Sequence, residues 1–166
     1  DLPTFGTSSE AHRIRRLRRL SGRPAALEEI WLDGSYIQTI DPEAVSESLY
    51  LFYRTKLSLW IARAEDQIGL DAVPDWAPEA FGHKAGAPIV HIQRISQDQE
   101  GVRAEVSRTW LDHTVARYVA RARYIDASTT RMVVVNLCTY MDACLESFAA
   151  QGLHAPPPGA REHAVF

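Results

Sequence analysis

The chain has 166 residues, of which 46% are hydrophobic and 23% charged, and its formal net charge is −3. These values predict one globular domain with room for an added tail, and they argue against a broad basic face for DNA. No apolar run approaches the length of a membrane span, and the two cysteines, Cys138 and Cys144, suit neither a zinc site nor a disulfide framework. We therefore expect a cytoplasmic protein that needs no cofactor or metal.

The opening of the chain predicts a β-hairpin. Residues 1–11 are polar and contain Gly, Ser and Thr, so we expect them to be loose. Residues 13–20 alternate as a strand does, Ser21-Gly22-Arg23-Pro24 has turn chemistry, and residues 25–32 are predicted to form the returning strand.

Six arginines fall within residues 13–23 of this acidic chain. Alternate residues of a strand share a face, so Arg16 and Arg18 lie on the same face as the apolar Ile14 and Leu20. An arginine on a core-like face needs a protein carboxylate or a ligand anion as its partner, because an unpaired buried charge is costly. The alternatives are a solvated strand with surface ion pairs and, since no aromatic residues are interleaved, less favourably a nucleic-acid contact.

The returning strand offers Glu28 as a partner. A three-residue loop would place Glu28 opposite Arg16 and the small Ala26 opposite Arg18, whereas a two-residue loop would pair Glu28 with Arg15. The sequence leaves both registers open.

Further elements follow in order. Asp41-Pro42 predicts a helix start and residues 46–53 its continuation; residues 57–70 predict a strand, 75–81 a short helix, and 89–95 with 102–111 a second hairpin. A weak repeat at an offset of 79 supports two similar hairpins: Gly22, Ala25, Trp31, Leu32 and Asp33 recur as Gly101, Ala104, Trp110, Leu111 and Asp112.

The C-terminal part has a different pattern. Apolar residues from Val134 to Phe148 recur at helical spacing, which predicts a helix over about 130–151, although the run Val133-Val134-Val135 could begin as a strand. The segment "HAPPPGAREH" that follows is expected to be a mobile tail.

The stretch "RLRRLSGRPAALEEIWL" resembles the first hairpin of the UTRA domain, the effector-binding domain of HutC/FarR-type GntR transcriptional regulators. Ser48-Leu49-Tyr50 is similar to the next element of that family, and "GAPIVHIQRI" with "VRAEVSRTWL" is similar to its second hairpin. The resemblance covers residues 12–121. One departure is Val106, which stands where the family usually has a tyrosine.

The resemblance implies an α+β fold similar to chorismate lyase, a mostly antiparallel sheet with flanking helices and a ligand pocket. It implies a homodimer whose effector is a small anionic metabolite, such as a sugar phosphate, an amino-acid derivative or a carboxylate. Operator DNA would be bound through an N-terminal winged-helix domain outside this chain. On this basis residues 1–11 are the remnant of a linker, 12–123 the UTRA-like domain and 124–166 an extension.

By motif match, the resemblance places the effector site on six residues: Arg16, Arg18, Glu28, Ser48, Tyr50 and Glu105. Two arginines can hold a phosphate or carboxylate through charge-assisted bonds, and carboxylates can accept from ligand hydroxyl or amino groups. Structural roles compete with each assignment: helix capping for Ser48, core packing for Tyr50, and a cross-strand ion pair with Arg16 or Arg103 for Glu105. The rival functions are a chorismate lyase-like enzyme and a dimerisation module without a ligand.

Overall fold

The computed structural model describes residues 4–42, 45, 48–123, 134–137 and 164–165. None of the helices in this part of the chain is long and apolar enough to span a membrane. The elements discussed below are strands β1 (Ala11–Leu20), β2 (Arg23–Asp33), β3 (Ile61–Ala72), β4 (Pro88–Asp98), β5 (Arg103–Leu111), β6 (Ala120–Arg123), β7 (Val134–Leu137) and β8 (Ala164–Val165), with helix α1 (Leu49–Lys56) and the 3-10 turns η1 (Gly34–Tyr36) and η3 (Glu79–Phe81).

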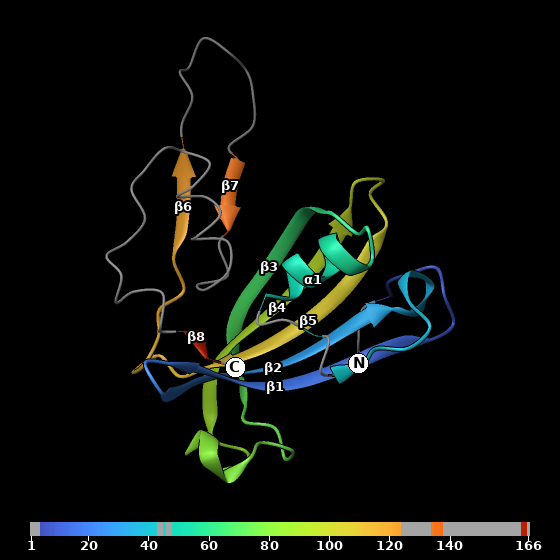
Figure 1. The fold of residues 1–166 in the computed structure, drawn as a ribbon. Helices are drawn as coiled ribbons and strands as arrows, with labels where there is room; N and C mark the ends of the chain where they lie inside the picture. The colour runs from blue at the N-terminus through green and yellow to red at the C-terminus, as the bar shows by residue number, and fades with distance from the viewer. Residues whose placement is uncertain (1–3, 43–44, 46–47, 124–133, 138–163, 166) are drawn as a thin grey trace. The chain divides into compact units, whose positions relative to one another are not determined.

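An antiparallel sheet in the order β3-β4-β5-β2-β1-β8 forms the body of the domain (Figure 1). Both predicted hairpins are confirmed, as β1–β2 and β4–β5. Their second strands pair with each other, Leu27 opposite Trp110 and Leu32 opposite Glu105. The two copies of the repeat thus lie on adjacent central strands, and the α+β class with a mostly antiparallel sheet is confirmed.

The first hairpin has the two-residue loop of one predicted alternative and the Arg16–Glu28 pairing of the other. Its loop has two residues, Ser21 and Gly22, and both have positive φ (51° and 74°), as hairpin turns with this twist require. A bulge between Arg18 and Arg19 then shifts the pairing by one residue, so that Glu28 faces Arg16. The expectation that a two-residue loop pairs Glu28 with Arg15 is wrong because it did not allow for this bulge.

Helix α1 packs against one face of the sheet. Its Leu49, Phe52 and Tyr53 join Ile30 and Leu32 of β2 in a buried apolar cluster. We call this side the α1 face. The helix begins at Leu49 and not at Asp41-Pro42, since the side chain of its N-cap, Ser48, accepts from the Leu51 N–H.

The opposite face is covered by the connection between β3 and β4. Val73 and Phe81 from this connection pack with Leu27 and Trp110 of the central strands. The predicted short helix over 75–81 is reduced to the 3-10 turn η3, which Pro78 precedes. A proline at this position has no N–H and disfavours a helical residue before it.

Residues 4–10, which precede β1, are attached to the sheet, contrary to the expectation that residues 1–11 are loose; residues 1–3 lie outside the described residues. The buried carboxylate of Asp33 accepts from the N–H groups of Thr7 (2.7 Å) and Ser8 (3.1 Å). Gly6 has φ of +77°, and a Cβ built there would lie 2.6 Å from the Asp33 carboxyl carbon. The chain therefore crosses the end of β2 in close contact, which needs a glycine.

Residues 117–161 belong to a second compact unit. Its described elements are β6 and β7, which pair in antiparallel fashion. Val134–Leu137 therefore form a strand, the alternative that the valine run allowed, and the predicted helix over 130–151 does not include them. The remainder of that predicted helix and the predicted tail from 154 to 163 lie outside the described residues.

Candidate functional site

The first part of the candidate site is an arginine pair that shares one carboxylate. Arg16 Nε lies 2.6 Å from Glu28 Oε2, and Arg18 Nη1 lies 3.4 Å from the same oxygen. The side chains of all three are largely buried, with exposed fractions of 15%, 6% and 11%. The prediction that Arg16 and Arg18 share a face is confirmed, and of the two registers that the sequence left open the structure pairs Glu28 with Arg16.

Glu28 remains ionised in this setting. Burial raises the pKa of its carboxyl, but the charges of Arg16 and Arg18 and their hydrogen bonds outweigh burial, so the pKa lies below its usual range. The neighbouring Glu29 points to the opposite face, where it pairs with the half-exposed Arg15 at 2.8 Å. The hairpin thus contains two similar arginine–glutamate contacts: the buried one of Glu28 with Arg16 and Arg18, and the partly solvated one of Glu29 with Arg15.

Glu105 lies on the α1 face in β5 and forms the second part of the site. Tyr53 Oη donates to one of its oxygens at 2.5 Å, and Ser96 Oγ donates to the other at 3.2 Å. Burial raises the pKa of the Glu105 carboxyl, and these bonds and the charges of Arg94 and Arg16 oppose burial without cancelling it. The hydrogen bonds that Glu105 accepts thus come from the hydroxyl groups of Tyr53 and Ser96, whereas the competing interpretation required an ion pair with Arg16 or Arg103.

Tyr50 extends this network from the same helix. Its hydroxyl lies 3.4 Å from Ser96 Oγ and accepts from Arg94 Nη1 at 3.3 Å. Arg94 is held by a bidentate pair with Asp66, at 2.6 and 2.7 Å, in which both side chains are almost fully buried. Burial raises the pKa of the Tyr50 hydroxyl, so it is neutral and can donate or accept.

Sequence reasoning missed four members of this network: Tyr53, Asp66, Arg94 and Ser96. A signal was present for two of them, because Arg94 and Ser96 alternate with apolar residues in β4 as Arg16 and Arg18 do in β1. For Asp66 the signal was the strand register, in which it lies directly opposite Arg94. Tyr53 follows Tyr50 by almost one helical turn and therefore lies on the same side of α1.

Ser48 has the structural role that competed with its functional assignment. It caps α1, and the Leu51 N–H donates to its hydroxyl at 3.2 Å. Ser48 lies at the start of the helix, as predicted. A contact between Ser48 and an effector stays a prediction.

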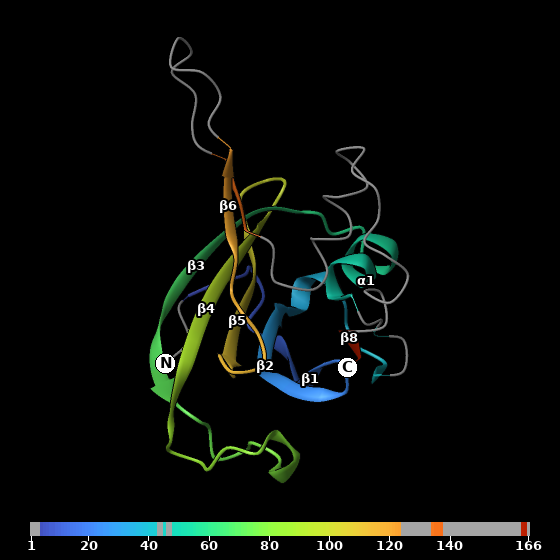
Figure 2. The ribbon, with the colours of Figure 1, turned by 90° about the vertical axis from the view of Figure 1, so that its left-hand side faces the viewer.

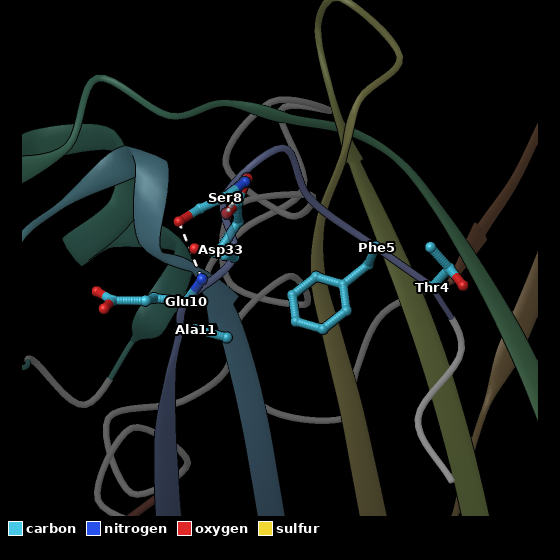
Figure 3. Close-up of a pocket in the computed structure, with 7 residues that line it drawn as sticks. Thr4, Phe5, Ser8, Glu10, Ala11 and Asp33 are labelled. Carbon is cyan, nitrogen blue, oxygen red and sulfur yellow. Dashed lines mark hydrogen bonds between the residues drawn. The ribbon is translucent and has the colours of Figure 1, made fainter.

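A cavity of about 250 Å³ lies apart from the arginine pair, where the N-terminal segment joins β1 (Figure 3). Its polar lining is engaged within the protein: Ser8 Oγ accepts from the Glu10 N–H at 3.1 Å, and Asp33 accepts from Thr7 and Ser8. Phe5 lines it as well. None of the described residues that line this cavity is cationic, so we do not assign it to an anionic ligand.

The order of the two hairpins agrees with comparison to known proteins. The family model described as "UTRA domain" matches residues 4–117. The chain belongs to the UTRA domain family. Among curated relatives of this UTRA chain, the HTH-type transcriptional regulator SmoD of Agrobacterium fabrum is 67% identical over 123 residues, which cover 74% of the chain and 53% of SmoD. The chain spans about half the length of the curated relatives it matches.

Solved structures show the same fold as the UTRA chain. A GntR-family transcriptional regulator from Enterococcus faecalis V583 superposes with a TM-score of 0.58 at 18% identity, over 69% of this chain and 82% of that one. The effector domain of PhnF from Mycobacterium smegmatis has a TM-score of 0.53 at 22% identity, over 63% of this chain and 64% of that one. At these identities the likeness shows the fold.

Proposed function

We propose that this chain is the effector-sensing and dimerisation domain of a HutC-type GntR regulator in the cytoplasm. It binds a small anionic metabolite, such as a sugar phosphate, an amino-acid derivative or a carboxylate. Binding changes the affinity for operator DNA of an attached N-terminal winged-helix domain. The effector site comprises Arg16, Arg18, Glu28, Ser48, Tyr50 and Glu105.

The convergence of Arg16 and Arg18 on Glu28 carries this proposal. A guanidinium has five N–H donors in a planar fork, so each arginine can bind the carboxylate and a ligand anion together. A site with little water strengthens these charge-assisted bonds. The two positive charges and one ionised carboxylate therefore suit one further negative charge.

The remaining groups suit the uncharged part of such a ligand. Glu28 can accept from hydroxyl or amino groups, and the neutral Tyr50 hydroxyl can donate or accept. Glu105 lies behind Tyr50 and Ser96 in the same network, so a ligand that engages Tyr50 also perturbs Glu105. We assign Arg94 and Asp66 a positioning role: Asp66 accepts two hydrogen bonds from Arg94, and Arg94 in turn donates to the Tyr50 hydroxyl.

The effector acts by a population shift. A ligand that binds one arrangement of the homodimer more tightly favours that arrangement, by no more than the difference between its two affinities. The attached DNA-binding domains are then repositioned with respect to the operator.

Thermal unfolding against a panel of sugar phosphates, phosphonates, amino acids and aromatic acids tests the proposal. A ligand present at 100 times its Kd adds about 2.7 kcal/mol to the free energy of unfolding. The stabilisation should disappear in Arg18→Ala and persist in Arg15→Ala, which alters the opposite face. Equal ligand affinity in Arg18→Ala and the wild type would refute the assigned site.

A further inference from the structure

Residues 4–10 are attached to β2 through Asp33, the last residue of that strand. The Asp33 carboxylate accepts from the backbone N–H groups of Thr7 and Ser8, at 2.7 and 3.1 Å, and from the Ser35 hydroxyl at 2.8 Å. Burial raises the pKa of the Asp33 carboxyl, but these hydrogen bonds outweigh burial, so the pKa lies below its usual range. Asp33 therefore holds the segment through charge-assisted hydrogen bonds.

A second attachment comes from β5, the neighbour of β2 in the sheet (Figure 2). The backbone carbonyl of Arg103 accepts from the Gly6 N–H at 2.8 Å, and Arg103 Nη1 donates to the Thr4 carbonyl at 3.0 Å. The two attachments lie at the same end of the sheet, since the β2–β5 register pairs Leu32 with Glu105. The path of residues 4–10 therefore depends on how the ends of β2 and β5 lie relative to each other.

Glu105 connects this end of the sheet to the candidate effector site. On the α1 face its carboxylate accepts from the Ser96 hydroxyl, and along β5 it is close to Arg103. Between them lies a bulge: Ser96 pairs with Glu105 but Gln97 pairs with Arg103, so Ala104 is an extra residue of β5. A bulge sets the local direction of a strand and of its side chains. A displacement of Glu105 is therefore passed to the backbone of Arg103 at the bulge.

We propose that residues 4–10 form a latch with an attached and a released state, and that Glu105 sets the balance between the two. The inference rests on the proposed function, because it names the contacts through which effector binding reaches the N-terminal winged-helix domain. In the attached state Asp33 and Arg103 hold the segment, as in this structure. A ligand that displaces Glu105 shifts Arg103 and favours the released state, by no more than the difference between its affinities for the two states.

Amide hydrogen exchange of this chain, without any ligand, tests the latch. Asp33→Asn removes the charge, so exchange at Thr7 and Ser8 should become at least about tenfold faster, as expected for loss of hydrogen bonds to a charged group. Arg103→Ala changes an exposed side chain, so the fold is retained, and it should speed exchange at Gly6 about threefold. Amides of the β4–β5 hairpin are the reference for global stability. Unchanged exchange at these positions in both variants would overturn the latch.

The same measurement tests the coupling to the effector site. Glu105→Gln keeps the shape of the side chain but removes one of its two acceptor oxygens, and Ser96→Ala is the milder variant that removes one donor. Both should speed exchange at residues 6–8 at least about threefold, whereas Glu29→Gln, the matched control on the opposite face, should not. Unchanged exchange in the first two variants, or an equal change in Glu29→Gln, would overturn the coupling. Because the assay contains no ligand, that failure is distinguishable from a failure of anion binding.

Discussion

Glu28→Gln isolates the charge that holds the arginine pair. The substitution keeps the shape of the side chain and an acceptor oxygen but removes the negative charge that Arg16 and Arg18 share. Removing one partner of a buried ion pair costs about 3–5 kcal/mol, because the other charge stays buried without compensation. Since glutamine still accepts a hydrogen bond, we expect the low end, about 3 kcal/mol.

Urea unfolding measures this loss. With a slope of about 1.5 kcal/mol per molar urea, a loss of about 3 kcal/mol lowers the midpoint by about 2 M. Glu29→Gln is the matched control on the opposite face: its partner Arg15 is 35% exposed, so the expected cost is at most about 1 kcal/mol. Equal midpoints for the two variants would refute the view that the arginine pair depends on Glu28.

The pH dependence of the Glu28→Gln effect has a definite sign. The folded state lowers the pKa of Glu28 from its ordinary 4.5, so the stability it contributes is present above about pH 4.5. That contribution is lost as the pH falls through the lowered folded-state pKa. The difference between wild type and variant should therefore shrink in acid.

Inorganic phosphate links the same variant to function. If the arginine pair is an anion site, phosphate can supply the charge that Glu28→Gln removes. We expect phosphate to raise the urea midpoint of Glu28→Gln more than that of the wild type, at constant ionic strength set with chloride. An equal rise in both proteins would show that phosphate does not bind between Arg16 and Arg18.

Three further predictions concern other parts of the structure. Burial raises the folded-state pKa of Glu105, so wild-type stability should fall as the pH rises from about 4.5 through that pKa; Glu105→Gln should remove this slope in urea unfolding at a series of pH values. Ser48→Ala should cost about 1 kcal/mol through loss of the helix cap, and an unchanged urea midpoint would contradict that role. Gly6→Ala should lower the thermal midpoint more than Gly82→Ala: both glycines have positive φ, but only at Gly6 would the added Cβ meet Asp33, whereas nothing lies within 4 Å at Gly82.

Short-range patterns accounted for both hairpins and for the shared face of Arg16 and Arg18. Alternation in a strand is a property of the local backbone, so it can be read from neighbouring residues. The register between strands was left open, because it depends on the bulge at Arg18 and Arg19 as well as on the loop. The start of α1 was misplaced because Asp41 and Ser48 are both good caps, and packing against the sheet selects Ser48.

The candidate site was predictable where the family motif and the strand pattern coincide, at Arg16, Arg18 and Glu28. The Tyr53–Glu105 and Arg94–Asp66 contacts were not, since their partners are 52 and 28 residues apart in the chain. Such pairs form only when strands from different hairpins become neighbours. The same packing buries Glu105 and Tyr50, and this burial raises the pKa of each group, which no local pattern encodes.

By itself, the sequence determined that this protein has two β-hairpins, a core-facing arginine pair and a regulator-like motif order. These properties follow from residue alternation, turn chemistry and side-chain type. Only the tertiary structure decided that Arg16 and Arg18 share one oxygen of Glu28, and that Arg94 of β4 is paired with Asp66 of β3. Both depend on strand order and register, which are settled by the packing of the whole sheet and not by any one segment.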